Sequence, residues 1–343
     1  MNSFLYFFTN SRRILALFAF RIVFVCAVLF FVGKTWASPP IKAVASIAPL
    51  HSLLQGVMGD VGKASLLLPA SASPHHASLR PSDLSIMREA TVVFYIDAEN
   101  FETFLPAILN VMPKSMRTVA VVQEAEISLL SMRKTSNNEH EHNTHDKHDH
   151  EVDEHDAHDE HSENMHDDHG KYDWHIWLDT ENAKQIVRLM ARELSIIDSP
   201  NATVYAANAR RLEARLTSLD SLLADMLVGA QGRPFVVFHD AYQYFERRYG
   251  LHNIGAITAE GQTPSVKQMS KLRHSIQKNE VVCVFGEAQF SNALISVAGE
   301  GERMKFGVLD PLGAQLEIGK ALYFELLLQM GKTFVDCLHH AKN

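Results

Sequence analysis

The chain has 343 residues, of which 46% are hydrophobic and 21% are charged, and its formal net charge is −8 at neutral pH. This length and apolar content are enough for two ordinary domains, each with its own hydrophobic core. Residues 139–169 account for the acidic excess of the mature chain, so the rest is close to neutral, and nothing indicates nucleic acid or an anionic membrane surface as a partner.

The first 37 residues have the pattern of a signal peptide. Basic residues precede or interrupt the apolar run 22–32, and Thr35 and Ala37 are small residues at the two positions that a signal peptidase recognises. We therefore expect cleavage after Ala37 and an exported protein. An uncleaved membrane anchor is the alternative, but Arg21 shortens the apolar stretch to well under the roughly 20 residues that a spanning helix needs.

Short apolar runs alternate with amphipathic stretches in the part of the chain that follows this leader. The amphipathic stretches 81–89 and 101–109 are predicted to be helices. The apolar runs are predicted to be buried strands, at 41–47, 65–68, 91–96 and 118–122. This alternation indicates a parallel sheet with helices on both faces.

Residues 139–169 hold ten histidines and thirteen acidic residues, with Lys147 as the only basic residue. Such a segment cannot bury enough apolar surface to offset the entropy of ordering, so we expect it to be disordered. Imidazole binds zinc, copper and nickel, and neighbouring carboxylates add charge attraction, so the segment is predicted to be an auxiliary, low-affinity metal loop. An acidic solvated loop with incidental histidines is the alternative. The ten histidines are His140, His142, His145, His148, His150, His155, His158, His161, His166 and His169.

The second half of the chain begins with two predicted helices. The first covers 180–197, and a longer one begins near Ser199 and Pro200, a cap residue followed by proline at a first-turn position. A stripe of leucines continues the longer helix to about Gly229. A helix of roughly 28 residues spans about 40 Å, more than a small domain requires. Strands then follow at 235–238, 253–257, 281–285 and 304–309, with helices at 241–249, 265–279, 291–299 and 321–338.

The sequence thus predicts an α/β protein with two lobes, each a mainly parallel sheet flanked by helices, joined by one long rigid helix. The expected divisions are a signal peptide at 1–37, an N-terminal lobe at 38–198 that includes the histidine-rich segment, a linking helix at 199–230 and a C-terminal lobe at 231–343.

Two cysteines are left once the leader and its Cys26 are removed, Cys283 and Cys337. An even number of cysteines in an exported chain predicts a disulfide. Its closure would stabilise the folded protein by about 4 kcal/mol in the chain-entropy model. Two buried thiols are the alternative, and a metal site built on these cysteines is disfavoured because the chain has no C-x-x-C pair.

Histidines occupy several junctions between predicted strands and helices. His75 and His76 follow the strand that ends near residue 68, His175 comes just before a helix, and His239 directly follows a strand. Ligands of open parallel sheets bind beyond the carboxyl ends of the strands, and clefts between domains are the other favoured place. Neutral imidazoles at such positions predict a zinc site made by three histidines with one further ligand.

Two acids near the expected site have different predicted roles. Asp310, at the end of the last predicted strand, is the candidate fourth ligand. Asp240 is expected to point away from the metal and to support a ligating ring. Three imidazoles with at most one carboxylate favour zinc over manganese.

Four stretches of the chain carry a resemblance to a known family. They are HHASLRPSDL at 75–84, DWHIWLD at 173–179, FHDAYQYFERRYG at 238–250 and VLDPLGAQLEIG at 308–319. In this order they resemble the motifs of the periplasmic zinc-binding component of high-affinity zinc ABC importers, the ZnuA family. An acidic histidine-rich segment also stands before the second motif in that family. The resemblance covers nearly the whole mature chain.

The resemblance implies a periplasmic, monomeric solute-binding protein that is not an enzyme and that delivers Zn²⁺ to a membrane permease driven by an ATPase. His75, His175 and His239 match the three histidine ligands of the family. Some members have an acidic residue just before the first histidine, where this chain has Pro74. Because proline has no ligand atom, the fourth ligand is expected to be Asp310, which matches an aspartate of manganese and iron relatives, or water. His76 is treated as non-ligating, and the cysteine pair matches a disulfide of some members.

Other functions stay open at this point. A manganese transport protein would use a related site, and a secreted zinc hydrolase would share three histidines but needs a general base, for which Glu287 is the one candidate near Cys283. A periplasmic metal buffer without a transporter would differ only in its partner. The histidine-rich segment is predicted either to collect zinc for the tight site or to sense abundant zinc and slow its delivery.

Overall fold

The structure is a computed structural model, and it describes residues 40–133, 172–262, 264–290 and 304–339. The leader predicted at 1–37, the histidine-rich segment 139–169 and the helix predicted at 291–299 lie outside the described residues. No helix in the described part of the chain is both long enough and apolar enough to cross a membrane.

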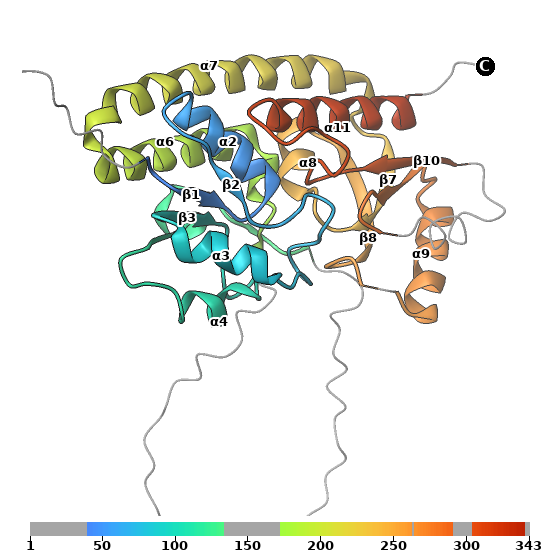
Figure 1. The fold of residues 1–343 in the computed structure, drawn as a ribbon. Helices are drawn as coiled ribbons and strands as arrows, with labels where there is room; N and C mark the ends of the chain where they lie inside the picture. The colour runs from blue at the N-terminus through green and yellow to red at the C-terminus, as the bar shows by residue number, and fades with distance from the viewer. Residues whose placement is uncertain (1–39, 134–171, 263, 291–303, 340–343) are drawn as a thin grey trace, which may run out of the picture. The chain divides into compact units, whose positions relative to one another are not determined.

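The N-terminal lobe contains a four-stranded parallel sheet with the strand order β2-β1-β3-β4 (Figure 1). Every predicted apolar run of this lobe overlaps one of its strands. The strands are β1 (Ala43–Ala45), β2 (Ser65–Leu66), β3 (Val92–Tyr95) and β4 (Arg117–Ala120), and the helices are α2 (Ala48–Met58), α3 (Pro81–Glu89), α4 (Leu105–Leu109) and α5 (Val121–Glu124).

Three details of this lobe differ from the sequence prediction. The run predicted as a strand to 122 leaves the sheet at Ala120 and continues as α5, and the helix predicted from 101 begins only at Leu105. Helix α2 was not predicted at all. Nine of its eleven residues are buried, so it has no polar face and therefore no amphipathic pattern in the sequence.

The C-terminal lobe contains a second four-stranded parallel sheet, with the strand order β10-β9-β7-β8 (Figure 1). Strand β7 lies in the middle of the sheet, and a shift of register between Phe235 and Val236 interrupts its pairing with β8. The strands are β7 (Pro234–His239), β8 (His252–Thr258), β9 (Cys283–Glu287) and β10 (Lys305–Leu309), and the described helices are α8 (Gln243–Tyr249), α9 (Val266–Lys278) and α11 (Leu322–Leu338).

A short antiparallel ribbon of two strands lies where the two lobes meet, beside the candidate site. Strand β5 (Leu130–Ser131) pairs with β6 (Tyr172–Asp173) on either side of the histidine-rich part of the sequence. The one-turn helix η1 (Ile176–Leu178) follows β6 directly. Strands of two residues are too short to give a sequence pattern, and the ribbon was not predicted.

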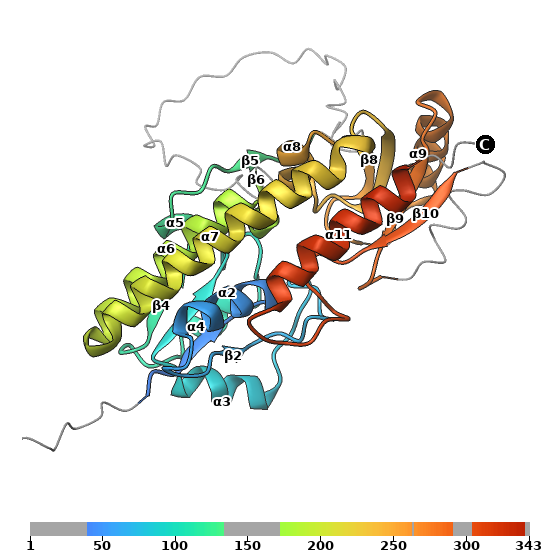
Figure 2. The same ribbon diagram turned by 90° about the horizontal axis from the view of Figure 1, so that it is seen from above.

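The long linking helix is the predicted one. Helix α7 (Ala202–Leu227) is extended at its two ends by the short helices η2 (Ser199–Asn201) and η3 (Val228–Ala230). It packs against α6 (Thr180–Ile197), α2 and α11, and Figure 2 shows α7 running alongside α11. Its buried leucine stripe belongs to one hydrophobic core that includes residues of both lobes. Each such leucine stabilises the fold by about 1.5–3 kcal/mol.

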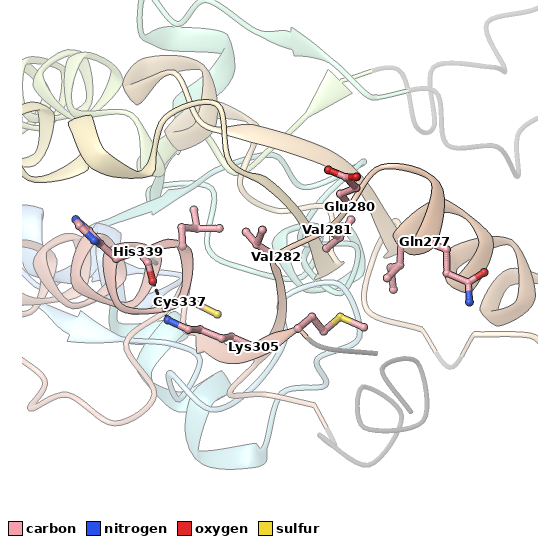
Figure 3. A pocket seen from close by; sticks show the side chains of 10 residues that line it. Gln277, Glu280, Val281, Val282, Lys305, Cys337 and His339 are labelled. Atoms are coloured by element: carbon pink, nitrogen blue, oxygen red, sulfur yellow. Dashed lines mark hydrogen bonds between the residues drawn. The ribbon is translucent and has the colours of Figure 1, made fainter. Parts of the chain in front are cut away.

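The predicted disulfide is present. It joins Cys283 at the start of β9 to Cys337 near the end of α11, with the two Cα atoms 5.9 Å apart. Next to it, Lys305 Nζ donates a hydrogen bond of 2.7 Å to the carbonyl oxygen of His339 (Figure 3). These two links hold α11 to the sheet of its own lobe.

The predicted fold class, with two parallel sheets and a long helix between them, is confirmed by the two sheets and by α7.

Candidate metal centre

Three histidines from three different elements converge between the two lobes. His75 lies in the loop between β2 and α3, His175 stands at the start of η1, and His239 is the last residue of β7. One ligand atom from each ring lies within 4.8 Å of the other two, and no other such group of three occurs among the described residues. The Nε2 atoms of His75 and His175 are 3.4 Å apart. The three candidate ligands of the sequence analysis are thus brought together.

The 3.4 Å spacing of the His75 and His175 nitrogens suits a tetrahedral zinc ion. With a Zn–N distance of about 2.0–2.1 Å, two ligands of a tetrahedral site lie about 3.3 Å apart. The Nε2 atom of His239 is buried and has no hydrogen-bond partner in the described structure, which is costly for a polar atom. The cavity between the rings has a volume of about 10 Å³. That space holds about one ion or one water.

A buried aspartate orients the ring of His175. Asp173 Oδ1 lies 2.7 Å from Nδ1 of His175 and also accepts a hydrogen bond of 3.0 Å from the backbone N–H of the same residue. Because a carboxylate oxygen accepts, Nδ1 carries the proton and Nε2 keeps its lone pair for a metal. The ring is therefore locked in the tautomer that binds metal through Nε2.

A buried glutamate does the same for His239. Glu287, the last residue of β9, places Oε2 3.0 Å from Nδ1 of His239, and the hydroxyl of Tyr242 donates to the same oxygen at 3.1 Å. Strands β7 and β9 are neighbours in the sheet, which brings the two residues together. His75 has no carboxylate partner of this kind among the described residues; its ring is half-buried and lies edge-on to Phe101, with the ring centres 4.8 Å apart.

The protonation of the three rings is unequal. Burial holds the pKa of His75 and of His175 well below 6.5, and the nearby His239 lowers both further by charge repulsion. Burial also lowers the pKa of His239, but the carboxylates of Glu287, Asp240 and Asp173 together outweigh burial and raise that pKa above 6.5. Two rings are therefore neutral at physiological pH, whereas His239 exchanges a proton for the metal.

Burial also raises the pKa of Asp173 to about 7. A doubly charged cation beside His175 favours the ionised form of this carboxylate, because opposite charges attract strongly in a buried site. Metal binding at the three rings and ionisation of Asp173 therefore support each other.

Asp310, the candidate fourth ligand, is engaged in its own loop. Its Oδ1 accepts hydrogen bonds from the side chain of Gln289 at 2.9 Å and from the backbone N–H groups of Leu312 at 3.1 Å and Gly313 at 2.8 Å. Gly313 has a φ of +78°, which glycine adopts without strain. The aspartate closes the turn after β10, and it is not part of the group of three ligand atoms in the described structure.

The remaining sequence candidates lie beside the cluster. His76 is exposed. Asp240 is buried, and its carboxylate forms no hydrogen bond to a described residue but lies 3.5 Å from the Arg133 guanidinium. Asp173 and Glu287, not Asp240, are the acids that orient the rings, and the sequence analysis missed this role for both. The motif around His175 contained a signal for Asp173, which stands two residues before the ligand.

Two larger cavities lie away from the three converging histidines. One of about 380 Å³ is bordered by Gln277, Lys305 and Cys337 near the disulfide (Figure 3), and one of about 620 Å³ lies between α2 and α7. Neither is lined by two or more histidines, so the small interlobe cavity is the better candidate for a metal.

Comparison with known proteins agrees with this geometry. The model of the family described as "Zinc-uptake complex component A periplasmic" (ZnuA) matches residues 43–337. The "High-affinity zinc uptake system protein ZnuA" of Paracoccus denitrificans is 40% identical over 307 residues, which cover 87% of this chain and 91% of the relative. The protein of the same name from Brucella abortus is 37% identical over 317 residues, covering 90% and 95%. A solved structure described as "Crystal structure of ZnuA" has a TM-score of 0.71 and 26% identity, covering 88% of this chain and all of that chain.

Proposed function

Since this chain belongs to the periplasmic zinc-uptake component A (ZnuA) family, we propose that it captures Zn²⁺ between its two lobes and delivers the ion to a membrane permease of the ABC type. The ligands in this proposal are His75, His175 and His239, with water or Asp310 in the fourth position. The observation that carries it is the convergence of three histidine rings, among them that of His239, whose Nε2 atom is buried without a hydrogen-bond partner in the described structure.

The ligand types favour zinc over manganese. Imidazole nitrogen suits zinc, whereas manganese prefers more oxygen ligands. The one acid proposed to supply such an oxygen, Asp310, already accepts three hydrogen bonds on Oδ1. A site that offers three nitrogens and at most one carboxylate therefore selects zinc.

A role in transport accounts for the site better than hydrolysis does. A zinc hydrolase needs a general base that can reach a metal-bound water. Glu287, the acid nominated for that role, accepts hydrogen bonds from His239 and Tyr242 through Oε2 and serves to orient a ligand. We therefore assign the chain to transport, with an ABC permease and its ATPase as partners in the periplasm.

The histidine-rich segment 139–169 is proposed to collect zinc for this site. It precedes His175 by only a few residues, so zinc held there is at high local concentration near the cavity. Deleting residues 139–169 and measuring zinc stoichiometry and uptake tests this role. Loss of the weakly bound ions together with slower uptake at low zinc supports it, and an unchanged stoichiometry contradicts it.

Elemental analysis after competition between zinc and manganese tests the main proposal. The protein without residues 139–169 is expected to retain one zinc per chain and to exclude manganese. His239→Ala is expected to lose this tightly bound zinc, whereas the matched control His76→Ala, at an exposed ring, keeps it. Retention of tight zinc by His239→Ala contradicts the proposed site.

A further inference from the structure

Two tyrosines at the start of α8 contact the two residues that orient the histidine rings. The hydroxyl of Tyr242 donates to Oε2 of Glu287 at 3.1 Å, and Glu287 holds Nδ1 of His239. The hydroxyl of Tyr244 donates to the backbone oxygen of Asp173 at 2.8 Å, and Asp173 holds Nδ1 of His175. One helix start thus reaches the supports of two proposed ligands, one from each lobe.

The two tyrosines point in different directions from the start of α8. Tyr242 is the residue just before the helix and has non-helical backbone angles, whereas Tyr244 lies in its first turn. Tyr242 faces the sheet of the C-terminal lobe, where it contacts Glu287 of β9, and Tyr244 faces the ribbon of β5 and β6. The pair therefore spans the boundary between the lobes.

The hydroxyl of Tyr244 forms hydrogen bonds to both strands of the ribbon, at two residues that pair with each other. Leu130 and Asp173 are partners in the ribbon, and the Tyr244 hydroxyl accepts from the N–H of Leu130 at 3.0 Å while it donates to Asp173. An isolated ribbon of two short strands is only marginally stable in water. The position of Asp173, and with it that of His175, therefore depends on docking to α8.

A charged contact docks the same ribbon to α8. The guanidinium of Arg133, two residues beyond β5, pairs with the carboxylate of Glu246 on α8. The ribbon is thus held by a neutral hydroxyl at one point and by an ion pair at another.

Both hydroxyls are permanent donors. The two tyrosine side chains are buried, and burial raises the pKa of Tyr242 and of Tyr244 above 10. They stay protonated at every pH at which imidazole binds metal, so their hydrogen bonds do not change with pH in that range.

We propose that Tyr242 and Tyr244 are positioning residues of the zinc site, which together set the directions of the His239 and His175 rings across the lobe boundary. This inference rests on the proposed function, because it assumes that these rings bind the ion. Neither tyrosine touches the metal. Loss of a hydroxyl is expected to weaken zinc binding by at least about 10-fold, the lower end of the range for groups that hold metal ligands, because each tyrosine acts through such a group.

The test uses Tyr242→Phe and Tyr244→Phe in the full mature chain. Zinc affinity is measured by competition with a chelator, and ligand geometry by the visible absorption of bound Co²⁺. Each variant is expected to lose at least tenfold in zinc affinity and to change the Co²⁺ spectrum, because the ring that it supports turns. A shift of the spectrum reports ligand geometry, which a general loss of stability does not alter.

The matched control is Tyr205→Phe. Tyr205 is also buried, and its hydroxyl also donates to a carboxylate, that of Asp198 at 2.7 Å, but it lies on α7 away from the cavity. We expect a lower melting temperature with unchanged zinc affinity and Co²⁺ spectrum. If Tyr242→Phe does not fold, Glu287→Ala takes its place, because it removes the oxygen that accepts from both the Tyr242 hydroxyl and Nδ1 of His239. If Tyr244→Phe does not fold, Asp173→Ala takes its place, because it removes the oxygen that accepts from Nδ1 of His175. Both are expected to change the Co²⁺ spectrum in the same way.

The results distinguish a failure of the positioning role from a failure of the proposed function. Wild-type affinity and spectrum in both Tyr242→Phe and Tyr244→Phe overturn the positioning role, and so does an equal loss of affinity in Tyr205→Phe. If instead His239→Ala binds zinc as tightly as the wild type, the proposed function itself fails, whatever the tyrosine variants do.

Discussion

The affinity for zinc is expected to fall with pH more gently than three ordinary histidines would dictate. Each ligand that must lose a proton costs about tenfold in affinity, or 1.4 kcal/mol, per pH unit below its pKa. Burial keeps the pKa of His75 and of His175 well below 6.5, so neither contributes near pH 6. His239 contributes one proton because Glu287 raises its pKa, and Asp173, with a pKa of about 7, contributes up to one more.

The expected slope near pH 6 is therefore one to two protons per zinc ion, a loss of about 10- to 100-fold in affinity per pH unit. Three unperturbed imidazoles would lose about 1000-fold per unit below their pKa. The assay is chelator competition between pH 5 and 8 on the protein without residues 139–169, corrected for protonation of the chelator. A slope of three at pH 6, or an affinity that does not change between pH 7 and 5, refutes the reasoning.

Two further predictions concern the fold. Leu219→Ala, on the buried face of α7, is expected to lower the free energy of unfolding by about 2–5 kcal/mol, because a cavity is left in the shared core. Leu222→Ala, at a side chain that is 49% exposed on the same helix, is the control and is expected to change it by less than about 0.5 kcal/mol. Equal effects in denaturant titrations would show that the stripe is not the core face. Replacing Cys283 and Cys337 together by serine is expected to cost about 4 kcal/mol of stability. Zinc affinity should not change, since the disulfide borders neither the rings nor the small cavity, and a large loss of affinity would contradict that separation.

Much of the fold could be predicted because its signals are local. Helices α3 and α6 have the predicted bounds, since Pro81 opens one and Asp179 caps the other by accepting from the N–H of Glu181. Helix α2 escaped prediction because a helix that is buried nearly all round has no polar face. The β5–β6 ribbon escaped because its pairing joins residues on either side of a long polar segment.

The site, like the fold, could be predicted only in part. The three histidines could be found because each follows a strand or precedes a helix: His239 ends β7, His175 stands at the start of η1, and His75 lies in the loop between β2 and α3. Ligands of parallel sheets gather at such junctions. The sequence could not show which acids orient the histidine rings. Glu287 meets His239 only through the pairing of β7 with β9, which no single stretch of sequence encodes. In the structure, Asp310 accepts hydrogen bonds from backbone N–H groups of its own loop. In a sequence, an aspartate with this role cannot be told apart from a metal ligand.

X-ray diffraction at the zinc absorption edge, on crystals of the zinc-loaded protein, would show which side chains hold the ion. We expect one strong anomalous peak about 2.0–2.1 Å from the Nε2 atoms of His75, His175 and His239. A tightly held ion that contacts other residues, with these three rings left without metal, would contradict the account.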